Sequence, residues 1–175
     1  MISSVPFLIR EATAADNILL ADLGWKCFEQ AFAATNNPSD MAAYLSATFI
    51  PTLQAAELAD PQHIFWLVYT GEELIGYVKL FTGATVACIS SANALKISRL
   101  YLAQAWWGQG IGLALLRCCL QYAQENKYTC VWLTVWEHNE RALALYQKLG
   151  FTAVGEEDFV LGQDVQRDFI MEKVL

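Results

Sequence analysis

Three glycines alternate in the stretch Gly108-Gln109-Gly110-Ile111-Gly112, and this stretch constrains the fold more than any other. An apolar run, Ile97 to Leu102, precedes it, and apolar residues at helical spacing follow it from Leu113 to Asn126. Without a Cβ atom, the backbone can adopt positive φ angles and approach a ligand closely. A helix that starts there points unpaired N–H groups and the positive end of its dipole at the loop. The stretch therefore predicts a strand–loop–helix unit whose loop binds a phosphate.

Two other phosphate-binding motifs do not fit this loop. A P-loop requires Gly-Lys followed by Ser or Thr, whereas this chain has Ile111-Gly112-Leu113. The dinucleotide fingerprint requires G-x-G-x-x-G, whereas the glycines here are spaced G-x-G-x-G. Glu137 nevertheless follows the next strand, about where a ribose-binding acid would lie. A nicotinamide-binding enzyme therefore stays open as an alternative, and tight binding of NAD would support it.

The rest of the chain carries strand and helix patterns, with no repeat, low-complexity tract or linker. Their order predicts a mixed sheet with helices on both faces, in one domain over residues 1–175. The expected strands are 7–10, 64–70, 74–81, 97–102, 128–136, 157–161 and 168–174, and the expected helices are 18–34, 41–49, 51–58, 113–126 and a last one capped by Asn139.

Composition narrows the class of protein and of partner. Apolar residues make up 55% of the 175 residues and charged residues 17%, as in a folded globular protein. The net charge of −7 argues against nucleic acid or an anionic membrane as the main partner and is compatible with a cationic substrate. The five cysteines form no CxxC pair, and neither a signal peptide nor a bilayer-spanning apolar run is visible. We therefore expect a cytoplasmic protein with reduced, buried cysteines, and we find neither a metal-ligand spacing nor a G-x-S-x-G motif.

Two blocks between Leu95 and Phe151 resemble the GNAT superfamily of acetyl-CoA-dependent N-acetyltransferases. The family's phosphate loop is Arg/Gln-x-x-Gly-x-Gly/Ala, which this glycine stretch matches, except that Trp107 stands where Arg or Gln is usual. Three further stretches look like a bacterial subgroup that includes spermidine/spermine N-acetyltransferases: Arg99-Leu100-Tyr101-Leu102, Val135-Trp136-Glu137-His138-Asn139 and Gln166-Arg167-Asp168-Phe169-Ile170-Met171-Glu172-Lys173. The family's second block is Asn-x-x-Ala-x-x-x-Tyr-x-Lys-x-Gly-Phe, which Asn139, Ala142, Tyr146, Lys148, Gly150 and Phe151 match.

The resemblance implies a GNAT fold with a mostly antiparallel sheet of about seven strands. It also implies acetyl-CoA as cosubstrate, no metal, and direct transfer of the acetyl group to an amine, so that no cysteine needs to be acylated. The implied cofactor-binding residues are Leu100, Tyr101 and Leu102 for the pantetheine arm, Trp107, Gly108, Gln109, Gly110, Ile111, Gly112 and Leu113 for the pyrophosphate, and Asn139 and Lys148.

The candidate catalytic residues follow from the second block. Tyr146 lies seven residues after Asn139, two helical turns away, so both side chains lie on one face of the last helix. By the resemblance, the Tyr146 hydroxyl protonates the departing thiolate of coenzyme A. Ser98 stands where related enzymes often carry a glutamate as general base. Glu137, with His138 beside it, is the substitute that we expect to act through water.

The acceptor is the least constrained part of this hypothesis. The subgroup resemblance and the acidic chain favour a primary amine of a small molecule, such as the polyamine spermidine. The helical region 15–58 and the tail loop near Gln163 lie outside the cofactor motifs, so we expect them to wall the acceptor cleft. Acetylation of an amino acid or a protein N-terminus, a non-catalytic CoA-binding module, and a homodimer stay open as alternatives. Candidate amine contacts are Asp40, Glu29 and Glu137.

Overall fold

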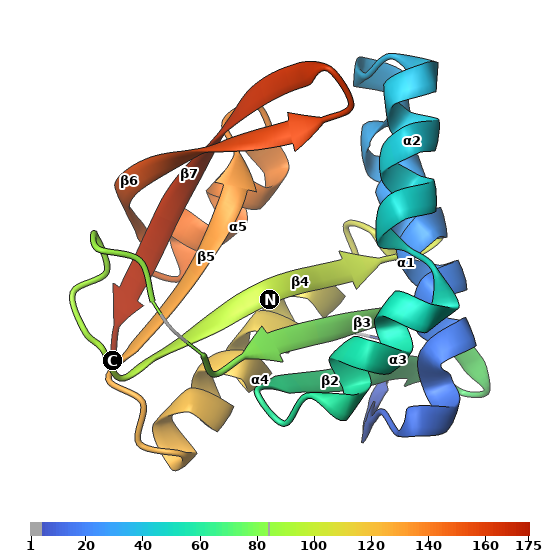
Figure 1. Cartoon of the computed structure of the whole chain (residues 1–175). Helices are drawn as coiled ribbons and strands as arrows, with labels where there is room; N and C mark the ends of the chain where they lie inside the picture. Colours follow the sequence, from blue (N-terminus) through green and yellow to red (C-terminus); the bar gives the residue numbers. More distant parts are fainter. Residues whose placement is uncertain (1–4, 84) are drawn as a thin grey trace.

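A seven-stranded sheet in the order β1-β2-β3-β4-β5-β7-β6 forms the centre of the protein. The computed structural model describes residues 5–83 and 85–175. Helices cover both faces of the sheet, and the sheet is mixed and mostly antiparallel, as the sequence predicts (Figure 1). The strands are β1 (Leu8–Glu11), β2 (His63–Thr70), β3 (Glu73–Phe81), β4 (Ala94–Leu102), β5 (Cys130–Trp136), β6 (Thr152–Leu161) and β7 (Asp164–Val174), and the helices are α1 (Asn17–Phe32), α2 (Pro38–Thr48), α3 (Pro51–Ala59), α4 (Ile111–Glu125) and α5 (Glu140–Lys148).

The C-terminal hairpin is longer than predicted. β6 begins at Thr152 and β7 at Asp164, whereas the sequence predicts strands only from residues 157 and 168. Three consecutive acidic residues, Glu156 to Asp158, interrupt the alternation of apolar and polar residues in β6. β6 is an edge strand with much of its length exposed, so its residues form strand without the apolar pattern that marks a buried one.

β4 and β5 are the parallel neighbours in the sheet, and they are paired over only three residues each. Ala94–Lys96 pairs with Cys130–Trp132, and beyond this point β4 continues against β3 while β5 continues against β7. Ser98 lies in a β-bulge, because Lys79 faces Arg99 and Leu80 already faces Ile97. The two central strands therefore diverge toward their C-terminal ends, as Figure 1 shows.

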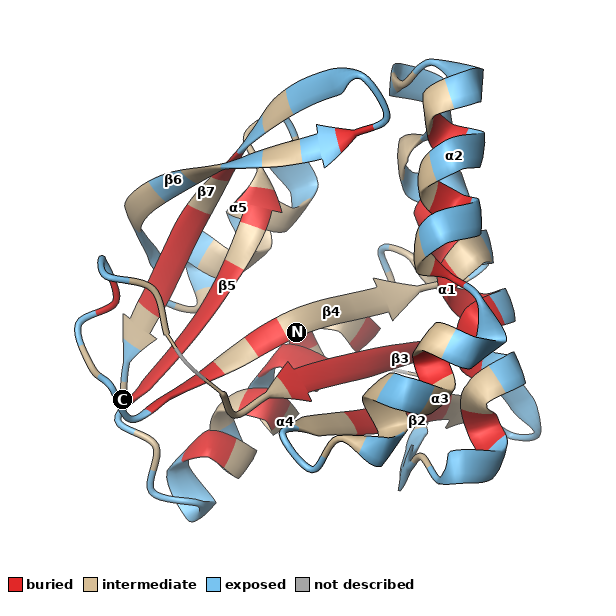
Figure 2. Ribbon diagram, in the orientation of Figure 1, coloured by how far each residue is buried: buried red, intermediate tan, exposed pale blue. Residues whose placement is uncertain are grey.

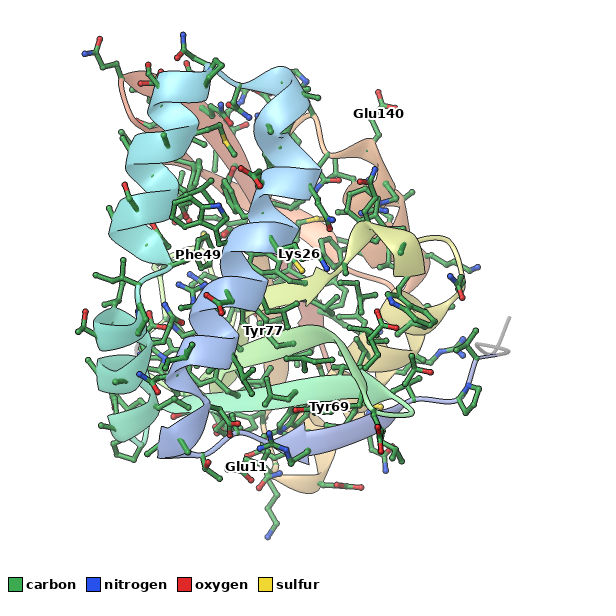
Figure 3. The ribbon with its side chains drawn as sticks, turned by 90° about the vertical axis from the view of Figure 1, so that its right-hand side faces the viewer. Glu11, Lys26, Phe49, Tyr69, Tyr77 and Glu140 are labelled. Atoms are coloured by element: carbon green, nitrogen blue, oxygen red, sulfur yellow. The ribbon has the colours of Figure 1, made fainter. Side chains whose placement is uncertain are left out.

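Each face of the sheet has its own apolar core. On one face, the α4 side chains Ile111, Leu115 and Leu116 are fully buried against the sheet, and α5 packs beside them. On the other face, α1 covers β2 and β3; Figure 3 shows Tyr77 of β3 beneath this helix, and Phe49 where α2 leads into α3. Figure 2 shows β3 buried along most of its length, whereas the C-terminal half of β4 is only partly covered. The partly covered strand is the one that diverges from β5.

Gly76 holds β3 close to the end of β4. Gly76 pairs with Leu102, and a Cβ atom added to Gly76 would lie 2.3 Å from the backbone oxygen of Tyr101. A larger residue would therefore push the end of β4 outward. The position of the β4 backbone thus depends on a glycine in the neighbouring strand.

Candidate active site

A cavity of about 530 Å³ lies where β4 and β5 diverge. Its lining comes from both faces of the sheet, because the separation of the two strands leaves a passage between them. The lining includes Ile97, Ser98, Leu100, Leu102, Trp107, Gly108, Gly110, Gly112, Leu113, Asn139, Ala142, Leu145 and Tyr146 on the α4–α5 side, and Phe28, Phe32, Asn36, Tyr44, Arg99, Tyr101, Thr134, Trp136, Glu157, Phe159, Gln166 and Asp168 on the α1–α2 side.

The glycine turn forms one end of this cavity. Gly108 and Gly110 have φ angles of +77° and +80°, which a residue with a side chain rarely adopts. Gly110 is the N-cap of α4, and its carbonyl accepts the N–H of Ala114 at 3.1 Å. The three preceding N–H groups, from Ile111 to Leu113, therefore have no acceptor within the helix. A Cβ atom on Gly108 would meet nothing within 4 Å, so a ligand can approach the backbone there.

Trp107 fixes the turn to both neighbouring elements. Its indole N–H donates to the backbone oxygen of Leu102 at 2.7 Å, at the end of β4. The guanidinium of Arg141, on α5, lies 3.7 Å from the centre of the Trp107 ring, within cation–π distance. The residue that departs from the usual family pattern thus ties β4, the turn and α5 together. No sequence motif pairs Trp107 with Arg141.

Asn139 and Tyr146 both face the cavity from α5, as their seven-residue spacing predicts. The Asn139 side chain caps the helix by accepting the N–H of Ala142 at 3.2 Å. Tyr146 is half-buried and packs on Phe151, with ring centres 5.9 Å apart. Loss of solvent raises the pKa of Tyr146 to about 12, so the hydroxyl keeps its proton at neutral pH.

Other predicted site residues lie away from the cavity lining. Glu137 accepts hydrogen bonds from the guanidinium of Arg167, with Nε at 3.0 Å, and this contact lowers the pKa of the Glu137 carboxyl. Lys148 is exposed near the C-terminal end of α5. Asp40 accepts the backbone N–H of Gln163 at 3.2 Å. The side chains of Gln109, Ile111, Glu29 and His138 are likewise outside the lining.

Aromatic rings wall the half of the cavity that lies toward α1 and α2. Phe32 of α1 meets Trp136 of β5 with ring centres 6.2 Å apart, and Tyr44 of α2 meets Phe159 of β6 at 5.4 Å. Of the segments expected to wall an acceptor cleft, residues 15–58 contribute to this half, whereas strands β6 and β7 contribute in place of the tail loop between them. Gln163 itself lies outside the lining.

Asp168 is the buried carboxylate of this second half, and sequence reasoning does not single it out. It is 9% exposed, and its Oδ1 atom has no hydrogen-bond partner among residues 5–83 and 85–175. On the sheet it lies between Trp136 of β5 and Glu157 of β6. Loss of solvent and the neighbouring Glu157 raise its pKa to about 6, against a smaller opposing effect of Lys96.

The α1–α2 side of the cavity also contains a cationic side chain, Arg99. Arg99 lines the cavity, and its guanidinium lies 3.2 Å from the carboxylate of Glu57. Lys79 binds the other oxygen of the same carboxylate at 2.7 Å. Two buried cations therefore share one anion, which leaves positive charge on this wall.

The cysteines are free thiols, and the cavity contains one of them. Cys27 lines the wall formed by α1, and burial raises the pKa of its thiol to about 12. Cys88 is exposed, contrary to the expectation that the cysteines are buried. In the described part of the chain, no three His, Cys, Asp or Glu side chains gather to hold a metal ion. No helix among those residues is long and apolar enough to span a membrane.

Comparisons with known proteins agree with this geometry. The family model described as Acetyltransferase (GNAT) family matches residues 21–151. An uncharacterized N-acetyltransferase encoded in the pepI 3′ region of Lactobacillus delbrueckii subsp. lactis is 34% identical over 148 residues, which cover 85% of this chain and 86% of the relative. An uncharacterized N-acetyltransferase of Mycobacterium tuberculosis is 28% identical over 156 residues, 89% of this chain and 96% of the relative.

Solved structures share the fold. The PaiA N-acetyltransferase from Thermoplasma acidophilum, crystallised in complex with coenzyme A, aligns with a TM-score of 0.77 at 21% identity, over 98% of this chain and 100% of that one. The ribosomal-protein-S18-alanine N-acetyltransferase from Escherichia coli aligns with a TM-score of 0.68 at 15% identity, over 97% and 94% of the two chains. The overall fold is therefore shared with other N-acetyltransferases.

Proposed function

Because the chain belongs to the GNAT family of acetyltransferases, we propose that it transfers the acetyl group of acetyl-CoA to a primary amine bound in the α1–α2 half of the cavity. Its activity is that of an acetyl-CoA-dependent N-acetyltransferase. The observation that carries the proposal is the passage between β4 and β5, which joins the glycine turn to a wall that carries the carboxylates of Glu157 and Asp168. Acetyl-CoA supplies an activated thioester, and the chain supplies position, charge and proton transfer.

The α4–α5 half of the cavity suits the cosubstrate. The free N–H groups at the start of α4 are donors for a pyrophosphate. Beyond the three paired residues, the edge of β4 that faces β5 has no strand partner among residues 5–83 and 85–175, so the backbone of Leu100 to Leu102 can pair with the amide groups of a pantetheine arm. We therefore propose binding by this backbone, by the turn 107–113 and by Asn139, with Lys148 near the phosphates.

Tyr146 is the general acid in this proposal. It lies on the cofactor side of the passage and keeps its proton at neutral pH. A thiolate that departs into the same poorly solvated space has a raised affinity for a proton, which favours donation by the Tyr146 hydroxyl. The high pKa of Cys27 fits a mechanism of direct transfer, because a protonated thiol is a weak nucleophile.

For the acceptor we propose a polyamine such as spermidine. Asp168 and Glu157 lie opposite each other on β7 and β6, so they offer two carboxylates to neighbouring ammonium groups. The aromatic rings around them can pack on the methylene chain and attract its positive charges. The net charge of −7 further attracts a polycation.

Arg99 favours a second class of acceptor, an amine that also carries a carboxylate. Arg99 lines the cavity and shares the Glu57 carboxylate with Lys79, so one anion serves two cations. An amino acid or a peptide N-terminus could place its carboxylate or carbonyl groups there and its amine near Asp168. This class is the competitor that an experiment must separate from polyamines.

An acceptor screen by mass spectrometry tests the proposal. The protein is incubated with acetyl-CoA and, separately, with spermidine, phenethylamine, glycine and a short peptide with a free N-terminus. We expect spermidine to gain one acetyl group at the highest rate. Acetylation of glycine or the peptide with spermidine inert would replace the polyamine assignment by the second class, and no transfer to any panel member would overturn acetylation of small amines.

We also propose a cellular location and a domain range for this enzyme. We place the enzyme in the cytoplasm, where thiols stay reduced, because its five cysteines are free. We also propose that residues 1–175 act as one catalytic domain, since the cavity takes residues from elements as far apart in the sequence as α1 and β7.

A further inference from the structure

We propose that Asp168 binds the ammonium group of the acceptor and removes its proton, and so acts as the general base of the transfer. This inference rests on the proposed function, and it identifies the base that the sequence leaves open at Ser98. Asp168 has no place in either block that resembles the family. It is found from its position in the fold.

Burial and an unused hydrogen-bonding atom single out Asp168. Its carboxylate lines the cavity, is 9% exposed, and keeps Oδ1 without a hydrogen-bond partner within the described ranges. A buried carboxylate oxygen without a hydrogen-bond partner is costly, and a ligand that donates a hydrogen bond to it would offset this cost. The donor that fits best is a cationic N–H group, because a charged donor makes a strong hydrogen bond to a carboxylate.

The neighbours of Asp168 set its affinity for a proton. Glu157 faces it from β6 and Trp136 from β5, while Lys96 of β4 contributes opposite charge. The hydroxyl of Tyr44, on α2, also interacts electrostatically with Asp168. Lys96 lies 4.4 Å from the centre of the Trp132 ring. Loss of solvent and Glu157 outweigh the lysine, so the pKa of Asp168 rises to about 6. At pH 7 the group is ionised but close to its pKa, as a general base requires.

Asp168 lies on the acceptor side of the passage, opposite Tyr146. Side chains alternate along a strand, and its neighbour Phe169 packs with the α4–α5 core while Ile170 packs on the opposite face. Asp168 shares the face of Ile170 and therefore points away from α5. The base and the acid then lie on the two sides of the diverging strands, one for the amine and one for the thiolate.

Asp168 and Tyr146 together account for every proton that moves in the transfer reaction. Asp168 takes a proton from the ammonium group, and the neutral amine attacks the thioester carbonyl carbon. A new C–N bond forms, the C–S bond breaks, and Tyr146 protonates the leaving sulfur. The amide nitrogen loses its second proton, which restores Tyr146 through solvent, and Asp168 releases the first proton to water. The net reaction converts an ammonium ion and acetyl-CoA into an amide, free coenzyme A and one proton.

Glu137 and Ser98 are less suited to this role. The Glu137 carboxylate is paired with Arg167 and lies outside the cavity lining. The arginine lowers the pKa of Glu137, which makes it a poorer acceptor of a proton. Ser98 lines the cavity, but its neutral hydroxyl is too weak a base to take a proton from an ammonium group.

The test is the pH dependence of kcat/KM for the panel amine with the highest rate. We expect the parent enzyme to lose activity below about pH 6, where Asp168 becomes protonated. Asp168→Asn should lower kcat/KM by about 100- to 10,000-fold and remove this acid limb, while binding of acetyl-CoA changes little. Glu157→Gln should move the limb to lower pH, because it removes the like charge that faces Asp168. Asp158→Asn is the control. It removes an exposed carboxylate next to Glu157 on β6, and it should leave the pH profile unchanged.

Two outcomes would overturn the role of Asp168. One is an Asp168→Asn enzyme that keeps the acid limb and at least a third of the parent kcat/KM. The other is a limb that disappears in Glu137→Gln and persists in Asp168→Asn. Both leave the acetyltransferase function standing, whereas absence of transfer by the parent enzyme overturns that function and this inference together. The pH dependence of the stability of the ligand-free enzyme tests the elevated pKa of Asp168 independently of activity.

Discussion

Replacing Asp168 by asparagine should stabilise the fold at neutral pH while it lowers catalysis. The pKa of Asp168 rises from 3.8 to about 6 on folding, and each unit corresponds to about 1.4 kcal/mol. The ionised carboxylate therefore costs the folded state about 3 kcal/mol. Because the folded pKa lies above the unfolded one, this cost is absent below about pH 3.8 and complete above about pH 6.

Chemical denaturation from pH 4 to pH 8 measures this effect. We expect the free energy of unfolding of Asp168→Asn, relative to the parent, to rise by up to about 3 kcal/mol across this range. Asp158→Asn is the control, and as a surface change it should stay within about 0.5 kcal/mol of the parent. A difference for Asp168→Asn that is constant with pH, or that shows destabilisation at pH 8, would refute an elevated pKa at this site.

Three further substitutions test other parts of the structure. Tyr146→Phe should lower kcat about 100- to 10,000-fold with little change in acetyl-CoA binding by calorimetry; a loss within twofold would mean that the ring only packs. Glu57→Gln should destabilise the fold by about 3–5 kcal/mol in urea, because it leaves Lys79 and Arg99 without their shared anion; an unchanged midpoint would mean that the cations are hydrated. Gly76→Ala should cost about 1–3 kcal/mol and weaken acetyl-CoA binding, because its methyl group meets the β4 backbone; normal stability and affinity would show that β4 shifts freely.

Local chemistry explains what the sequence could predict. The glycine turn is specified by residues next to one another, because the need for positive φ at Gly108 and Gly110 is a property of each position. The common face of Asn139 and Tyr146 follows from helical spacing alone. The central strands and α4 are marked by apolar patterns, because they are buried on both sides or along one stripe.

The sequence predicts that residues 15–58 contribute to the α1–α2 half of the cavity, but not which side chains meet there, because that depends on contacts between distant segments. Asp168 is unremarkable in sequence, and its unusual environment arises only when Glu157 faces it and the helices α1 and α2 close over the site. Glu137 was favoured because it lies beside a motif, but Arg167, thirty positions later in the chain, occupies its carboxylate. The edge hairpin β6–β7 was underestimated for a related reason, since exposed strands lack an apolar pattern.

The passage between β4 and β5 also divides the cavity into two halves that are formed largely by different parts of the sequence. The α4–α5 side of the cavity is lined by the stretch from β4 to α5, whereas the α1–α2 side, proposed to bind the amine, also takes residues from α1, α2 and the β6–β7 hairpin. Mutations in the second set can therefore accumulate without disturbing the first. Gene duplication followed by drift in those walls would yield enzymes with new amine preferences and the same acetyl donor. An engineer who wishes to change the acceptor should accordingly randomise the helices and the hairpin, and leave the glycine turn alone.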